Sequence, residues 1–252
     1  MTERVDDTGA MPPVLLLAGG LGTRLRPLTD HTPKCLVPIA GTPLLDYWRQ
    51  SFERQGVRDV IVNVHAHPEQ MRDYIERRED GPVHWRAFEE PALLGSAGTL
   101  RETLPMLEEA PDFLVIYADN LSDADLPAFV RFHRDHEAEF TMALFETAAP
   151  SSCGIATLEP TGRISAFVEK PENPTSNLAN AGIYAIRSGV VGPLMDRDSR
   201  DIGFDLLPRL VGRMYGWLIS GYHRDIGNPQ ALARAEADVK SGALHRAQED
   251  TN

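Results

Sequence analysis

The sequence of 252 residues has only two cysteines, Cys35 and Cys153, and neither belongs to a CxxC or CxxH spacing. A zinc site and a disulfide framework are therefore not expected, and this cysteine usage fits a reducing cytoplasm. Long hydrophobic runs are also missing, because glycine, proline or a charged residue interrupts every apolar stretch before the roughly 18 residues that a membrane helix needs. The opening residues, MTERVDDTGAMPP, contain no apolar segment typical of a signal peptide. We therefore expect a cytoplasmic location and no membrane partner.

Positive charge is scarce as well, with 25 Lys and Arg against 37 Asp and Glu and a formal net charge of −12. Nucleic-acid binding requires a basic surface, so nucleic acid is not an expected partner. One stretch departs from this balance: from Leu15 to Lys34 the chain reads LLLAGGLGTRLRPLTDHTPK, with glycines and three bases around a single acid. An acidic protein that binds an anion must gather positive charge locally, and this stretch does so.

The first half of the chain alternates short apolar runs with amphipathic segments. Strands are predicted at 14–19, 57–64, 83–88 and 112–119, and helices at 43–55, 68–78, 96–104 and 126–136. Thr42 can cap the first helix, and Pro105 is expected to stop the third. This β-α-β-α order is typical of an α/β fold with a mostly parallel central sheet and helices on both faces.

Beyond residue 139 the pattern changes to a smaller α+β insertion. Strands are predicted at 139–146, 179–187 and 215–220, with a hairpin over 154–171, a helix near 204–211 and a last helix over 229–240. We interpret residues 13–241 as one domain with parts 13–138 and 139–228 and a closing helix over 229–241. The ends, 1–12 and 242–252, are expected to be a disordered lead-in and a flexible tail.

The turn after the first strand has the composition of a phosphate-binding loop, because glycines let an anion approach backbone N–H groups. It is not the dinucleotide fingerprint GxGxxG, which would need glycine where Leu25 stands, nor a Walker A loop, which would need Gly-Lys-Ser/Thr in place of Gly22-Thr23-Arg24. These mismatches argue against a dehydrogenase and a small-molecule kinase. GG-x-G-T-R-L-x-P-L-T is followed instead by PKCLVPI. Arg24 can fork onto phosphate oxygens, and Lys34 adds a second cation.

These residues resemble the N-terminal signature of sugar-1-phosphate nucleotidyltransferases, and the resemblance extends from about Val14 to Asp238. Further motifs follow in the family's order: VNVHAHPEQM, EEPALLGSAGTL, YAD, FVEKP, NAGIY, FDLLPRL and GYHRDIGNP. Among the branches, the chain is most similar to mannose-1-phosphate guanylyltransferases and their relatives. The resemblance implies a Rossmann-like sheet and a transferase of nucleotide-sugar biosynthesis. Its partners would be an NTP, with GTP favoured, and a sugar 1-phosphate, and its products an NDP-sugar and pyrophosphate.

The same resemblance assigns the nucleotide end of the site. Catalytic roles fall to Arg24, Lys34 and Asp119, and Asp119 with Asp225 would hold the cofactor Mg²⁺. Asp119 also follows an apolar strand, where α/β proteins place ligands. The nucleotide-binding residues are Leu17, Ala18, Gly19, Gly20, Gly22, Thr23, Arg24, Gly95, Ser96 and Gly98. Ser96 in LGSAGTL would face the base, but a plain helix cap fits this turn equally well, so guanine is an expectation only.

At the sugar end, Glu169 would accept sugar hydroxyls, and Lys170 would pair with the sugar's phosphate. Gly154 and Asn180 complete this pocket by resemblance. The sequence does not identify the sugar, and a mannose-, heptose- or cyclitol-like ring suits it. One departure is Ala118 before the metal-binding aspartate, where the family usually has glycine.

Two alternatives stay open. One is a thymidylyl- or uridylyltransferase acting on another sugar or cyclitol 1-phosphate. The other is a non-catalytic homologue that binds nucleotide-sugar and regulates a partner, although the intact catalytic set argues against it. No C-terminal β-helix domain is expected after the last helix, and the sequence leaves open whether the chain forms a homo-oligomer.

Overall fold

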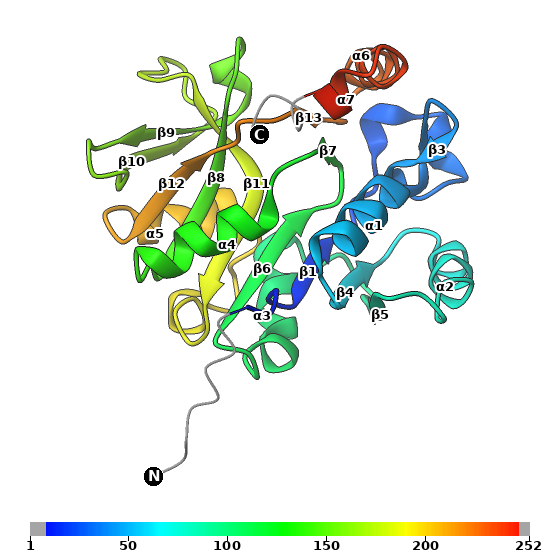
Figure 1. The fold of residues 1–252 in the computed structure, drawn as a ribbon, viewed down its shortest axis with the longest axis horizontal. Helices are drawn as coiled ribbons and strands as arrows, with labels where there is room; N and C mark the ends of the chain where they lie inside the picture. The colour runs from blue at the N-terminus through cyan, green and yellow to red at the C-terminus, as the bar shows by residue number, and fades with distance from the viewer. Residues whose placement is uncertain (1–8, 247–252) are drawn as a thin grey trace.

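The computed structural model describes residues 9–246 (Figure 1). The expected lead-in and tail lie partly outside this range, at residues 1–8 and 247–252. Within it, the tail expectation is wrong for residues 243–246, which form helix α7 (Ala243–Arg246) with Leu244 only 4% exposed. Met11, expected in the lead-in, packs against the core. Among residues 9–246, no helix has the length and apolarity required to cross a membrane.

A nine-stranded sheet forms the centre of the molecule. Its parallel part contains β1 (Val14–Leu17), β4 (Asp59–Val64), β5 (His84–Glu89) and β6 (Asp112–Tyr117), in the order β6-β1-β4-β5. The other strands are β8 (Phe140–Glu146), β9 (Gly154–Leu158), β10 (Ile164–Glu169), β11 (Leu178–Arg187) and β12 (Met214–Leu218). Strand β11 pairs antiparallel with β6, and β9 and β10 form the predicted hairpin. The two halves of the chain therefore share one sheet, which confirms the α/β fold.

Side chains alternate between the two faces of the sheet, and each face has its own core. In β1, Val14 and Leu16 belong to one cluster and Leu15 to the other. The first cluster is covered by α1 (Leu44–Gln55), α2 (Pro68–Glu76) and α4 (Leu126–Asp135), and the second by α3 (Ser96–Leu107) and α5 (Leu207–Leu210). Figure 1 shows α1 and α4 in front of the strands and α3 behind them. Burial on both faces explains the uninterrupted apolar runs in β1 and β6 at the centre of the sheet, whereas the edge strand β5 is largely exposed.

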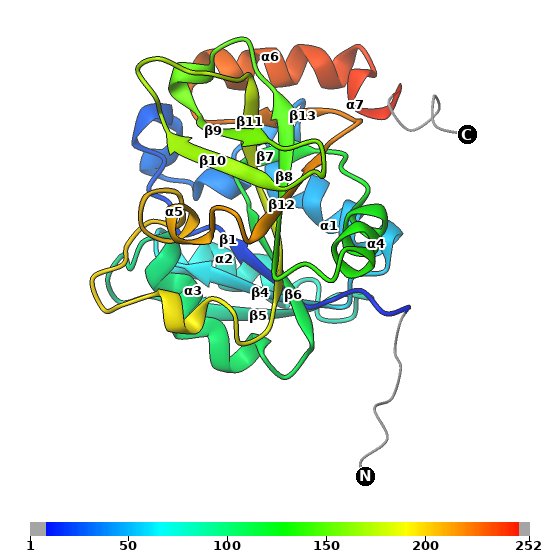
Figure 2. The same ribbon diagram turned by 90° about the vertical axis from the view of Figure 1, so that its left-hand side faces the viewer.

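A smaller third core closes the end of the sheet at which β1 and β6 finish. Helix α6 (Pro229–Lys240) lies across this end, above two short two-stranded sheets (Figure 2). These are β7 (Asn120–Ser122) with β13 (His223–Asp225), and β2 (Pro38–Ile39) with β3 (Thr42–Pro43). Leu25, Ile39 and Leu232 belong to the core beneath α6. The phosphate-loop segment is thereby anchored against the last helix of the domain.

Three local predictions were wrong. Thr42 does not cap α1, because it pairs with Ile39 in β3 and the helix begins only at Leu44. Pro105 does not stop α3, which continues to Leu107 although the proline has no N–H to donate to the Arg101 carbonyl. The helix expected near 204–211 is a π-helical turn over Ile202–Leu206 followed by α5.

Candidate active site

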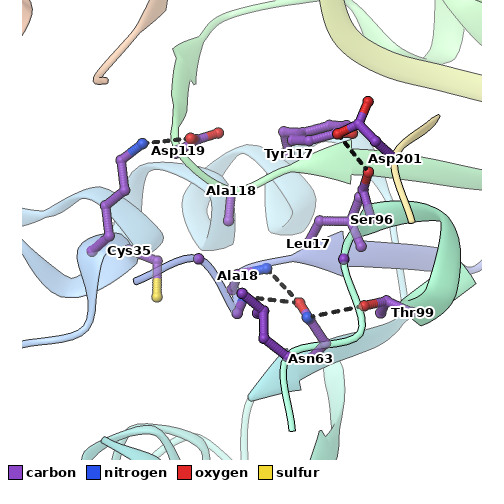
Figure 3. Close-up of a pocket in the computed structure, with 15 residues that line it drawn as sticks. Leu17, Ala18, Cys35, Asn63, Ser96, Thr99, Tyr117, Ala118, Asp119 and Asp201 are labelled. Carbon is purple, nitrogen blue, oxygen red and sulfur yellow. Dashed lines mark hydrogen bonds and ion pairs between the residues drawn. The ribbon is translucent and has the colours of Figure 1, made fainter. Parts of the chain in front are cut away.

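Two cavities of about 240 Å³ each open at the carboxyl ends of β1 and β6. The first cavity lies between the loop after β1 and the N-terminus of α3, and Figure 3 shows its lining. The second lies over the β9–β10 hairpin and β11. Tyr117, Asp119 and Asp201 line both cavities, so the two spaces meet at these side chains. The carboxyl ends of parallel strands are where open α/β sheets bind ligands.

Most of the residues predicted to bind nucleotide line the first cavity. They are Leu17, Ala18, Gly19, Gly20, Gly95 and Ser96. Arg24 lines the second cavity instead, and Gly22, Thr23 and Gly98 line neither. Gly95 has a φ of 78°, and a Cβ there would collide with the carbonyl of Arg200, so only glycine fits this entry into α3.

The loop after β1 presents fewer free amides than its glycines suggest. The backbone N–H groups of Ala18 and Gly19 donate to Asn63 Oδ1 at 2.6 Å and 3.0 Å (Figure 3). These two amides are therefore engaged within the protein and are not available to an anion in this arrangement. Gly22, at φ 61°, holds the next turn by accepting a hydrogen bond from Thr29 Oγ1 at 2.8 Å.

Lys34 and Asp119, 85 positions apart in the sequence, form an ion pair with Nζ 2.5 Å from Oδ2. Lys34 is 8% exposed and lies in the short 3₁₀ turn Lys34–Leu36. An ammonium group this buried needs a partner, and the carboxylate supplies one. The prediction that both residues belong to one site is consistent with this geometry.

Asp225 is brought beside Asp119 by the pairing of β13 with β7. Asp225 lies opposite Asn120, and the Ile226 N–H donates to the Asp119 carbonyl at 2.9 Å. Desolvation and then the negative charge of Asp119 raise the pKa of the Asp225 carboxyl, while Lys34 and Arg24 oppose this shift. The Arg24 guanidinium lies close by, since a Cβ on Gly227 would be 3.0 Å from Arg24 Nη2 and 2.8 Å from Asp225 Oδ2.

These two carboxylates fit a divalent cation. The negative charge of Asp119 raises the pKa of Asp225, and a cation between the two carboxylates would relieve that repulsion. Within residues 9–246 there is no cluster of three or more metal-ligating side chains. Mg²⁺ commonly needs only one or two carboxylates, because waters and substrate phosphates complete its shell. The donor set is therefore compatible with a metal shared between protein and substrate.

The second cavity contains the residues predicted to hold the sugar: Gly154, Glu169, Lys170 and Asn180. Burial, and secondarily the charge of Asp201, raises the pKa of Glu169, while Lys170 lowers it. A Cβ at Gly154 would collide with both Glu169 Oε2 and the ring of Phe167, so a larger residue would displace the Glu169 carboxylate or the ring. Asn180 donates to Tyr184 Oη at 2.7 Å and accepts from the Gly182 N–H at 2.9 Å, which fixes its orientation.

Sequence reasoning missed Asp201, Tyr117 and His223. Asp201 lines both cavities, caps the π-helical turn through the Phe204 N–H, and lies 3.5 Å from Ser96 Oγ. It stands in an irregular segment, so no periodic pattern marks it. Tyr117 ends the predicted strand directly before Ala118 and Asp119, and this position was a signal that could have been used.

A ligand site at the carboxyl ends of a parallel sheet, with buried positive charge beside paired carboxylates, places the protein among α/β folds that handle phosphorylated ligands. More particularly, residues 13–242 match the family described as nucleotidyl transferase, and the chain belongs to that family.

Curated relatives carry more specific names. The catalytic subunit beta of mannose-1-phosphate guanylyltransferase from Drosophila pseudoobscura pseudoobscura is 34% identical over 220 residues, covering 86% of this chain and 59% of the relative. The mannose-1-phosphate guanylyltransferase of Mycobacterium tuberculosis is 29% identical over 232 residues, covering 90% and 64%. The chain thus spans less than two thirds of the length of these relatives.

Solved structures share the fold. HddC from Yersinia pseudotuberculosis, complexed with GMP-PN, superposes with a TM-score of 0.78 at 24% identity, covering 91% of this chain and 100% of that one. A putative glucose-1-phosphate thymidylyltransferase from Bacillus anthracis gives 0.80 at 24% identity, with coverages of 89% and 94%. At this identity the likeness concerns the fold, and it confirms the predicted Rossmann-like architecture.

Proposed function

We propose that the protein transfers a nucleoside monophosphate from an NTP, with GTP favoured, to a mannose- or heptose-like sugar 1-phosphate. The observation that carries this proposal is the junction of the two cavities at Asp119, which is paired with Lys34. A reaction that joins a nucleotide to a second substrate needs two adjacent binding sites, with charged groups at their junction that neutralise the phosphates. The guanylyltransferase names of the curated relatives and the GMP-PN complex of the HddC fold support guanine as the base.

In this proposal the first cavity takes the base, and the loop from Gly20 to Arg24 takes the triphosphate. Ser96 faces the base at the N-terminus of α3. Lys34 and Arg24 neutralise negative charge on the phosphates as it shifts toward the leaving pyrophosphate.

The second cavity takes the sugar 1-phosphate. Glu169 and Asn180 hold hydroxyl groups of the ring, and Lys170 pairs with its phosphate. A phosphate oxygen of the sugar attacks the α-phosphorus in line, and the bond to the pyrophosphate breaks, so no covalent enzyme intermediate is needed. Asp119 and Asp225 would hold Mg²⁺, which when bound neutralises phosphate charge and makes the α-phosphorus more electrophilic.

A matrix of nucleoside triphosphates against sugar 1-phosphates, read by pyrophosphate release, tests the proposal. We expect the highest kcat/KM with GTP and a mannose- or heptose-like 1-phosphate. Preference for dTTP or UTP would support the thymidylyl or uridylyl alternative. Absence of turnover with every pair, together with tight binding of an NDP-sugar, would replace the proposal with a regulatory nucleotide-sugar-binding protein.

A further inference from the structure

A buried carboxyl group lies behind the first cavity without lining it. Glu90 follows β5, is 4% exposed, and its N–H donates to the Val64 carbonyl at 2.8 Å. Its side chain points between β4 and the N-terminus of α3, where Asn63 is 4% and Thr99 is 1% exposed. Packing of a parallel sheet does not require a carboxyl group here, and burying one is costly unless it is hydrogen-bonded.

The first arm of this network reaches the phosphate loop. Asn63 Nδ2 donates to Glu90 Oε1 at 3.0 Å, and this bond orients the amide so that its Oδ1 accepts from both Ala18 and Gly19. Gly19 is pressed against the same amide, since a Cβ there would be 2.5 Å from Asn63 Nδ2. The position of the loop after β1 therefore depends on the orientation of Asn63.

The second arm reaches the turn proposed to face the base. The Leu94 N–H donates to Glu90 Oε2 at 3.3 Å, and Thr99 Oγ1 donates a short hydrogen bond to Glu90 Oε1. Leu94 begins the segment Leu94–Thr99, and Thr99 ends it in the first turn of α3. Glu90 therefore accepts hydrogen bonds from both ends of this segment. A fully bonded buried network of this kind holds its members in one arrangement.

We propose that Glu90 is a positioning residue for nucleotide binding, which fixes the phosphate loop and the Leu94–Thr99 turn at the separation that one nucleotide spans. Glu90 acts through Asn63, Thr99 and Leu94 rather than through the substrate. The inference rests on the proposed function for the identity of the ligand, a nucleoside triphosphate. The second cavity shares none of these hydrogen bonds, so sugar-phosphate binding is independent of them.

A graded series of variants tests the proposal. Glu90→Gln keeps one carbonyl acceptor but places an amide N–H₂ group opposite another donor. Glu90→Met keeps similar bulk and removes both oxygens, which together accept three hydrogen bonds. We expect the KM for the NTP to rise about threefold in the first and about tenfold or more in the second, with the KM for the sugar 1-phosphate within about twofold of wild type. Calorimetric titration of GTP with Mg²⁺ should show the same order of binding losses.

Thr141→Val is the matched control. Thr141 is fully buried, its Oγ1 is 2.8 Å from His133 Nδ1, and neither residue lines a cavity. This variant should lower the melting temperature as Glu90→Gln does, yet leave both KM values unchanged. Equal KM values for NTP in Glu90→Met and Thr141→Val would overturn the positioning role while leaving the transferase intact. A wild-type protein that binds GTP without turnover would overturn the proposed function, and the titrations would still decide the role of Glu90.

Discussion

The two cavities of the site are built in different ways. The first is formed by main chain and by a fully buried polar network at the ends of parallel strands, with Asn63, Glu90 and Thr99 holding its walls. The second is formed by charged and polar side chains on antiparallel strands, such as Glu169 and Asn180.

This difference separates two kinds of recognition. The proposed nucleotide site, made from backbone and buried hydrogen bonds, would recognise shape and change only when the residues that support it change. The proposed sugar site, made from side chains on β10 and β11, could change its preference by single substitutions that leave the sheet intact. We predict that substitutions of the side chains assigned to the sugar, Glu169 and Asn180, alter the KM for the sugar phosphate alone, whereas substitutions at the junction of the two cavities affect both substrates.

The largest effect is expected at the junction of the two cavities, where one substitution should impair the use of both substrates. Lys34→Ala should lower kcat/KM for both substrates by about a hundredfold or more, the scale of losing an electrostatic contact in a transition state. It also leaves the Asp119 carboxylate without its ion pair. Arg26→Ala is the control: Arg26 pairs with Asp30 at the surface, its side chain is 62% exposed, and activity should be unchanged. Near wild-type turnover of Lys34→Ala by pyrophosphate release would remove this lysine from the mechanism.

A smaller effect should be confined to the second cavity. Glu169→Gln keeps the shape of the side chain but weakens its acceptance of hydroxyl groups, so the KM for the sugar 1-phosphate should rise about tenfold. The KM for the NTP should stay the same. Glu172→Gln, an exposed neighbour in the same segment, is the matched control and should be neutral. If both KM values rose together in Glu169→Gln, the two cavities would not be separate sites.

The ionisation of Glu169 allows the difference between the two cavities to be tested through the pH dependence of the KM for the sugar 1-phosphate. Burial raises its pKa above the ordinary value of 4.5. If the carboxylate accepts the sugar hydroxyls as proposed, sugar-phosphate binding should weaken as pH falls through this raised pKa. The KM for the sugar phosphate in Glu169→Gln should lack this acid limb. The pH dependence of stability runs the other way. Because the pKa of Glu169 is raised in the folded state, the folded protein favours the protonated acid, and the ionised carboxylate lowers the free energy of unfolding as pH rises through this pKa. Glu169→Gln should therefore melt at a higher temperature than the wild type at neutral pH.

The smallest effect concerns His223, which lines the second cavity with its ring centroid 4.7 Å from that of Phe145. Burial lowers its pKa to about 4, so the imidazole is neutral at physiological pH. His223→Phe keeps an aromatic ring and removes the polar edge. We expect overall activity within about threefold, the scale of one neutral hydrogen bond, but an altered ratio of kcat/KM between two sugar 1-phosphates. An unchanged ratio across the panel would show that His223 does not contribute to the choice of sugar.

The fold and the candidate catalytic and binding residues could largely be predicted from the sequence, whereas the buried residues that position them could not. Asp119 could be placed because it follows an apolar strand, and the Glu169-Lys170 pair because it ends a recognisable hairpin and matches the FVEKP motif of the family. Glu90 lies in the EEPALLGSAGTL motif, but no local pattern shows that its carboxyl group is buried behind a cavity. Asp201 meets Ser96 from 105 positions away, and only the tertiary fold brings these two together. Similarly, Thr42 has the residue type of a helix cap, but pairing with Ile39 takes precedence.

The most direct test of the account is a crystal structure with a non-hydrolysable GTP analogue and Mg²⁺. The account predicts the base in the first cavity beside Ser96, the triphosphate along the loop from Gly20 to Arg24, and the cation between Asp119 and Asp225, with the second cavity free for the sugar phosphate. A triphosphate bound elsewhere, or an Asp119 side chain turned away from it, would contradict the account.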